Sequence, residues 1–253
     1  MELVEYWRAR RALIWYLVVL VVGALFTVAF SGHANVNVDV NDKQVVFPRV
    51  VPLSVLMSVA MFFTAILASW VGLALNRENA TRELTWTRPI PRAALALRFI
   101  GIDAAALAIA YAATVAVLWL VVGLQVRVVV EPRIPVVLFM ASGVIAMWYA
   151  LVLILSAGVR GHGGAIAGLL WPAALIVLAV GSSPSRGFIH DAAVVLNVFN
   201  PFAYLGHIGR SAPDGTPVPL LWPLDESMRA LIVWCFAAAF TAAAVTIWRR
   251  REI

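Results

Sequence analysis

Residues 135–155 read PVVLFMASGVIAMWYALVLIL, a run that contains no charged side chain. A helix needs about 20 predominantly apolar residues to cross roughly 30 Å of hydrocarbon, and this run supplies that length. The segments of similar character elsewhere in the chain are 13–30, 52–75, 95–122, 164–181 and 229–248. The sequence therefore predicts an all-α polytopic membrane protein with six transmembrane helices.

The composition of the whole chain agrees with a membrane location. Its 253 residues are 63% hydrophobic and 13% charged, and the mean hydropathy is +0.92. Soluble domains carry about 25% charged residues, and a domain of this length still exposes roughly a quarter of its unfolded surface. We therefore expect lipid to solvate a single transmembrane domain that covers residues 1–253.

The arginines predict the topology of the spans. The termini and the connections 76–94 and 156–163 carry basic residues close to span ends. These residues are Arg8, Arg10, Arg11, Arg77, Arg82, Arg88, Arg92, Arg160, Arg249, Arg250 and Arg251. Positive residues beside spans favour the cytoplasmic side, so both termini are predicted to be cytoplasmic. The formal net charge of +6 does not indicate a nucleic-acid partner, because the arginines cluster beside apolar segments and do not form a soluble basic face.

The segments outside the spans also carry patterns. Residues 1–12 mix apolar and charged side chains, which predicts a short amphipathic helix along the cytoplasmic interface. In the long external loop 182–228, apolar residues recur at helical spacing over 188–199, and a second short piece follows over 202–208. This loop is predicted to hold a re-entrant helical pair before the last span. Alternation over 35–47 predicts a small external hairpin.

Several tryptophans fall near the predicted ends of spans. They are Trp15, Trp70, Trp119, Trp148, Trp171 and Trp248. Amphipathic rings favour the headgroup level of a bilayer, so we expect these side chains at the membrane surfaces.

The connection between the second and third spans, residues 76–92, reads NRENATRELTWTRPIPR. Opposite charges interleave along it, and Glu78 stands four residues before Arg82, which is the favourable order on a helix. Pro89 and Pro91 then impose extended backbone, because the residue before a proline avoids helical geometry. The pattern predicts a short charged helix parallel to the membrane, followed by an extended entry into the third span.

Three features of this connection occur together: Arg77-Glu78, Leu84 and the turn Arg88-Pro89-Ile90-Pro91-Arg92. They resemble the cytoplasmic signature of type-2 ABC exporter permeases. The resemblance is strongest over 70–100 and extends as topology to the whole chain. Two positions depart from the family pattern, because Pro91 stands where a small polar residue is usual and Arg82 where glycine is common. The segment 197–202 is similar to the external Asn-Pro segment of those permeases.

The resemblance implies a function and a set of partners. Residues 76–86 would form the coupling helix that sits in a groove of a cytoplasmic ABC ATPase subunit. The residues implied in that contact are Arg77, Glu78, Asn79, Thr81, Arg82, Glu83 and Leu84. A second permease, identical or related, and two ATPase subunits would complete an exporter in a bacterial plasma membrane. Its cargo would be an amphipathic drug, peptide, lipid or lipid-linked glycan.

The sequence predicts no enzymatic chemistry in this chain. A P-loop needs a lysine that follows a glycine, whereas the sole lysine, Lys43, lies in an external Asp-Lys-Gln sequence. ATP and Mg are therefore expected in the partner ATPase, and no cofactor is expected here. The histidines His33, His162, His190 and His207 form no metal-binding motif, and no metal site is predicted.

Alternatives to the exporter hypothesis stay open at this point. The 76–92 connection could be a solvated loop whose arginines only fix topology, and the protein could be an accessory membrane anchor. Asp103, the acid well inside a predicted span, could carry protons in a secondary transporter. Arg98 lies on a different helical face from Asp103. We favour a structural interhelical contact for this carboxylate.

Overall fold

The computed structural model describes residues 2–30, 36–40, 43–47, 50–75, 92–158, 163–183, 187–205, 209–211, 217–219 and 224–250. Within them the α-helices are α1 (Glu2–Phe30), α2 (Leu53–Val71), α3 (Arg92–Gly123), α4 (Ile134–Gly158), α5 (Gly163–Ser182), α6 (Phe188–Asn197) and α7 (Glu226–Arg250). The 3-10 helices are η1 (Gly72–Leu75) and η3 (Pro201–Tyr204). The described chain is thus predominantly helical, as predicted.

Short strands pair outside the helices. They are β1 (Val36–Val40), β2 (Lys43–Phe47), β3 (Val50–Pro52), β4 (Arg127–Val129), β5 (Gly209–Ser211) and β6 (Pro217–Pro219). The antiparallel pairing of β1 with β2 confirms the predicted hairpin, with Val38 opposite Val45. The β3 and β4 strands pair in parallel and join the start of α2 to the segment before α4. The remaining pair, β5 and β6, is antiparallel.

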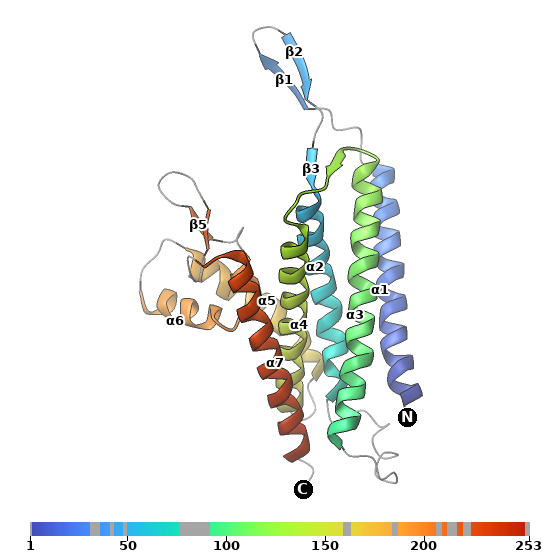
Figure 1. Ribbon diagram of the computed structural model, residues 1–253, viewed down its shortest axis with the longest axis vertical. Coiled ribbons are helices and arrows are strands. Elements are labelled where there is room, and N and C mark those ends of the chain that lie inside the picture. The colour runs from blue at the N-terminus through green and yellow to red at the C-terminus, as the bar shows by residue number, and fades with distance from the viewer. Residues whose placement is uncertain are drawn as a thin grey trace.

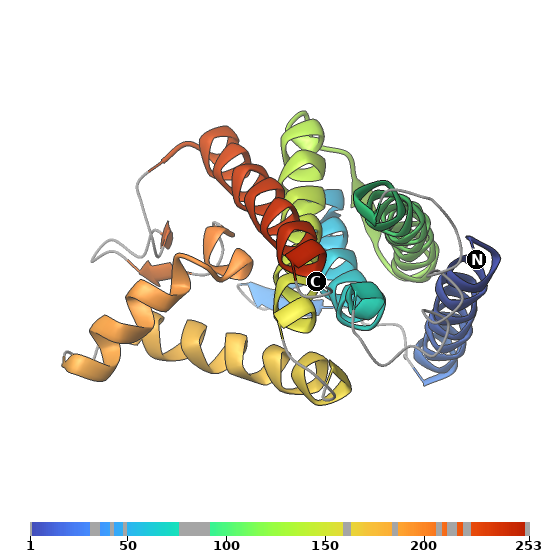
Figure 2. The ribbon, with the colours of Figure 1, turned by 90° about the horizontal axis from the view of Figure 1, so that it is seen from below.

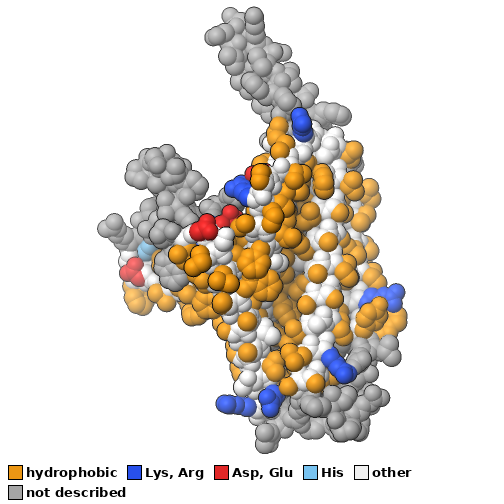
Figure 3. Space-filling model, in the orientation of Figure 1, with side chains coloured by type: hydrophobic (Ala, Val, Ile, Leu, Met, Phe, Trp, Pro, Cys, Tyr) orange, Lys and Arg blue, Asp and Glu red, His pale blue; other side chains and the backbone are white. Residues whose placement is uncertain are grey.

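Five of the described helices are long and apolar enough to cross a membrane. Their spanning stretches are Tyr6–Thr27, Leu53–Val71, Ala93–Gly123, Ile134–Gly158 and Glu226–Arg250. Figure 1 shows these helices side by side along the long axis of the molecule. Over them, Figure 3 shows a broad apolar surface whose charged side chains lie near the helix ends. The protein is therefore a multi-pass membrane protein, as the sequence predicted.

The sixth predicted span, 164–181, differs from the other five. It corresponds to α5, which has 20 residues, and the apolar stretch of α5 that is described is Gly168–Ser182. Figure 2, which looks from below, shows α5 along its length while the neighbouring helices are seen closer to end-on. Pro172 inside α5 lacks an N–H and removes one helical hydrogen bond. Five of the six predicted spans therefore correspond to helices that are long and apolar enough to cross a membrane, and the sixth span is not confirmed.

The predicted interfacial helix over 1–12 is not a separate element. Helix α1 runs without interruption from Glu2 to Phe30 and has 29 residues. No proline or glycine interrupts residues 2–12, so the helix continues directly into the apolar stretch. At 1.5 Å per residue, α1 is about 44 Å long and exceeds the hydrocarbon thickness. The interfacial helix predicted over 1–12 is therefore not confirmed as an element of its own.

Helix α4 lies at the centre of the core. Its side chains Met147, Trp148 and Val152 are fully buried against α2 and α7. The face of α7 toward the core carries Ala230, Ala237 and Ala244 at intervals of seven residues. Small residues at this spacing let two helices approach closely, which is the main source of association between helices in lipid. Ala237 and Ala244 are accordingly buried at this interface.

Candidate functional site

The residues implied in ATPase contact lie outside the described residues. They are Arg77, Glu78, Asn79, Thr81, Arg82, Glu83 and Leu84. Both flanks of their segment are described, since η1 ends at Leu75 and α3 begins at Arg92. In Figure 1 these flanks lie at the end of the bundle where the chain starts and finishes. The candidate site is therefore the group of contacts that fixes η1 and α3 on either side of this segment.

An ion pair links α1 to α3 close to that end. The Arg8 Nη2 atom donates to Asp103 Oδ1 at 3.0 Å and to Oδ2 at 3.2 Å. The carboxylate is only 1% exposed, whereas the Arg8 side chain is 26% exposed. A charge in hydrocarbon is expensive unless it is paired, and the guanidinium supplies that compensation here. The predicted interhelical contact of Asp103 is confirmed.

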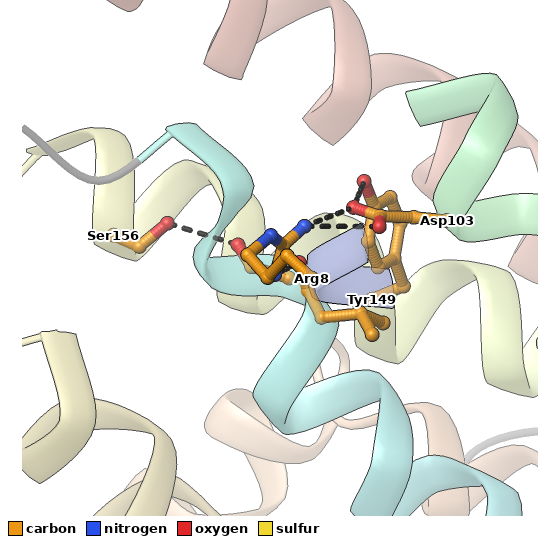
Figure 4. Close-up of polar contacts among 6 residues, drawn as sticks. Arg8, Asp103, Tyr149 and Ser156 are labelled. Atoms are coloured by element: carbon orange, nitrogen blue, oxygen red, sulfur yellow. Dashed lines mark hydrogen bonds and ion pairs between the residues drawn. The ribbon is translucent and has the colours of Figure 1, made fainter. Parts of the chain in front are cut away.

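The ion pair extends to α2 and α4 (Figure 4). The Tyr149 hydroxyl of α4 donates to Asp103 Oδ2 at 3.0 Å. Arg8 Nη1 donates to the Val71 carbonyl at the end of α2 at 3.2 Å. The last carbonyls of a helix have no intrahelical partner and carry partial negative charge, so a guanidinium there is favourable. We call Arg8, Asp103, Tyr149 and the Val71 carbonyl the polar lock, which joins four helices.

The neighbouring turn is fixed by two further hydrogen bonds. Ser156 Oγ donates to the Gly72 carbonyl at 3.1 Å, and Trp148 Nε1 donates to Ser69 Oγ at 2.8 Å. A Cβ atom on Gly72 would lie 2.9 Å from a Val152 methyl carbon, so only glycine allows this approach of η1 to α4. The start of the 76–92 connection is thus anchored to α4. Trp148 is fully buried between helices, and its expected depth at the headgroup level stays a prediction.

Sequence reasoning missed Arg8 as the partner of Asp103. The two residues are 95 positions apart, so helical spacing could not connect them. Arg8 was assigned to topology together with Arg10 and Arg11, which are both exposed. One available signal was that a carboxylate inside a span requires a cation, and Arg8 lies near the start of the first span. Tyr16 adds a second bond between α1 and α3, 2.6 Å from Thr114 Oγ1.

A second polar contact holds α6 against α5. Asn197 Nδ2 donates to the Val177 carbonyl at 3.0 Å, and Asn200 Nδ2 donates to the Ala174 carbonyl at 2.9 Å. Asn200 Oδ1 accepts from the Phe202 N–H and so starts η3. The helix predicted over 188–199 is present as α6. Its entry into the outer leaflet stays a prediction.

Aromatic rings pack where η3 meets the bundle. The Phe202 ring centroid lies 5.1 Å from those of Phe62, Trp148 and Trp171. Phe202 is fully buried, and the rings come from α2, α4, α5 and η3. Trp171 therefore packs in this cluster, although the sequence placed it at the headgroup level. The cluster ties the oblique α5 and the η3 turn to the upright helices.

Gly181 allows the close approach of α6 to α5. A Cβ atom at this position would collide with Asn197 Nδ2. We expect Gly181→Ala to lower the free energy of unfolding by about 1 kcal/mol, because the overpacking cost exceeds the gain in helix propensity. Thermal unfolding of the purified protein measures this. Gly168→Ala on the same helix meets no atom within 4 Å and should not destabilise the protein. Equal destabilisation by both variants would contradict the proposed contact.

Comparison with known proteins gave no match. No protein-family model, no curated protein and no solved structure matches the chain. Among the described residues, no group of three or more His, Cys, Asp or Glu side chains could hold a metal ion.

Proposed function

We propose that the chain is the membrane-spanning permease subunit of an ATP-driven exporter of the type-2 ABC class. The polar lock carries this proposal, because it ties four helices together directly before the connection that carries the resemblance. The substrate would be an amphipathic molecule taken from the cytosol or the inner leaflet. ATP and Mg would be bound by the separate ATPase subunit, and this chain would supply transport.

The polar lock suggests how an ATPase could move the helices. A push on the 76–92 connection would act on η1 and on the start of α3. Because Arg8 binds both Val71 of α2 and Asp103 of α3, α1 would move with that pair. Packed elements shift as rigid bodies, so a small displacement can change a large interface. The second polar contact and the aromatic cluster would transmit the motion to α5 and α6.

An exposed stripe of α2 suits a second permease subunit. The residues Val55, Val59, Phe63, Ile66 and Trp70 recur at intervals of three or four and are all exposed. Because of this spacing they lie on one face of α2. We propose that the part of this stripe nearer β3, from Val55 to Phe63, faces an identical or related permease across the transport path.

A proton-driven secondary transporter is supported less well. A proton carrier inside a span must exchange its proton with water, whereas Asp103 is almost fully buried. Its two oxygens accept hydrogen bonds from Arg8 and Tyr149. The guanidinium compensates the carboxylate, so burial does not require a bound proton. These contacts favour a structural role for Asp103.

The coupling assignment is tested by Glu78→Lys in a complex of this chain with the ATPase subunit that co-purifies with it. Reversing a charge within the proposed contact should lower substrate-stimulated ATP hydrolysis about tenfold, because like charges at an interface are costly. Hydrolysis and transport are measured in proteoliposomes. Asp191→Lys is the matched control, since this exposed acid lies on α6, away from the chain termini.

Two outcomes would remove the proposal. Full activity of Glu78→Lys would show that residue 78 does not contribute to coupling. Failure of the purified chain to retain any ATPase subunit would instead favour an accessory or anchoring membrane protein, which is the main alternative.

A further inference from the structure

A groove of about 1100 Å³ runs along the seam between α1 and α2. Its lining residues are Trp7, Arg8, Arg10, Arg11, Ala12, Ile14, Trp15, Tyr16, Val19, Ile66, Leu67 and Trp70. The lining is strongly asymmetric. Three arginines lie at the end near the chain start, whereas the part farther along α1 is apolar. Among the described residues that line it, none is acidic.

The polar groups deep in the groove already have partners. Arg8 binds Asp103 and the Val71 carbonyl, and the Tyr16 hydroxyl is hydrogen-bonded to Thr114. The charges of Arg8 and Asp103 compensate each other. Arg10 and Arg11 are exposed at the rim and supply the excess positive charge. A ligand that fits this groove therefore carries negative charge at one end only.

The walls of the groove suit an acyl chain. Ile14, Val19 and Ile66 are exposed apolar side chains along the two helices. Trp15 and Trp70 are each about two-thirds exposed and border the same groove. Such rings favour the headgroup level, directly below the charged layer of a bilayer. From Arg8 to Val19 the groove changes from cationic to apolar over about 16 Å of helix, which is close to half of a hydrocarbon core of roughly 30 Å.

We propose that this groove binds an anionic glycerophospholipid, with its phosphodiester at Arg10 and Arg11 and an acyl chain along Ile14, Val19 and Ile66. Basic pockets between membrane helices on the cytoplasmic side recognise acidic headgroups by this combination of charge and apolar area. Arg10 also stacks over the Trp7 ring at 4.8 Å, which holds the guanidinium at the rim. The lipid would cover the seam beside the polar lock. The inference requires membrane residence only and does not rest on the exporter proposal.

The test uses the full-length protein in neutral detergent, titrated with brominated phosphatidylglycerol or brominated phosphatidylcholine. Bromine quenches nearby tryptophans, and Trp7, Trp15 and Trp70 border the groove. We expect phosphatidylglycerol to quench at lower concentration than phosphatidylcholine. In the double variant R10Q/R11Q the concentration for half-maximal quenching should rise about 25-fold, because each basic residue near a membrane surface contributes about fivefold.

Matched variants separate this site from general charge attraction. R249Q/R250Q removes the same charge at the chain end of α7, outside the groove lining, and should leave the titration unchanged. Val19→Phe keeps both arginines, adds no tryptophan and fills the apolar part, so it should weaken lipid binding without disturbing the buried core. Thermal unfolding of each variant confirms that it is folded.

Several results would overturn the proposal. Equal affinity for phosphatidylcholine would exclude headgroup recognition, and equal weakening by R249Q/R250Q would indicate non-specific attraction. Competition by soluble glycerol phosphate at the lipid's own concentration would indicate a site for a free anion. Cross-linking of two copies through Ile14→Cys, in a background without Cys235, would assign the groove to a second subunit.

Discussion

Replacing Arg8 by methionine should lower the free energy of unfolding by about 3 kcal/mol, since removing one member of a buried ion pair leaves an uncompensated charge. Methionine keeps much of the apolar stem but cannot donate to the Asp103 carboxylate or to the Val71 carbonyl. The Tyr149 hydroxyl would remain as one donor to that carboxylate. Thermal unfolding in detergent, followed by circular dichroism, measures the loss.

Two variants show whether the loss comes from the ion pair. Arg10→Met removes an exposed arginine from the same helix and should change stability by no more than about 0.5 kcal/mol. The double variant R8M/D103L removes both charges and should recover most of the loss, because an apolar pair can replace a buried ion pair. If R8M/D103L is less stable than R8M alone, compensation of the carboxylate is not the reason for the contact.

The elements that sequence predicted well depend on local chemistry. Five spans follow from the length of uncharged apolar runs, since hydrocarbon thickness fixes that length for any spanning helix. The β1–β2 hairpin and the helix over 188–199 follow from periodicity around turn residues. These features depend on residues close together in the chain, so no tertiary information was needed.

The elements that sequence missed depend on contacts between distant segments. The oblique course of α5 accompanies the side-chain bonds of Asn197 and Asn200 to its carbonyls, which no hydropathy pattern records. The position of Arg8 beside the first span is explained by the positive-inside rule alone. The sequence therefore gave no reason to expect an ion pair with a carboxylate 95 residues away. Trp148 looked like an interfacial ring because it is aromatic and near a span boundary. Its hydrogen bond to Ser69 explains how the indole can be buried.

Truncating Phe202 to alanine should cost about 3 kcal/mol, at the lower end of the range for buried phenylalanines. Lipid and detergent are as apolar as the ring, so part of the usual transfer free energy is absent. The remaining cost in free energy comes from the cavity and from the lost contacts with Phe62, Trp148 and Trp171, whose ring centroids each lie 5.1 Å from that of Phe202. The thermal unfolding midpoint and the tryptophan emission maximum both report on this loss.

The emission maximum distinguishes a local loosening from a general one. Detachment of η3 should let water or detergent reach the indoles of Trp148 and Trp171 and shift their emission. Phe188→Ala is the matched control, because this ring lies on α6 and is 87% exposed. It should change neither the midpoint nor the emission. In a double-mutant cycle with Trp171→Phe, a coupling of about 0.5–1.5 kcal/mol is expected for adjacent rings. A coupling near zero would mean that Phe202 fills space without linking η3 to α5.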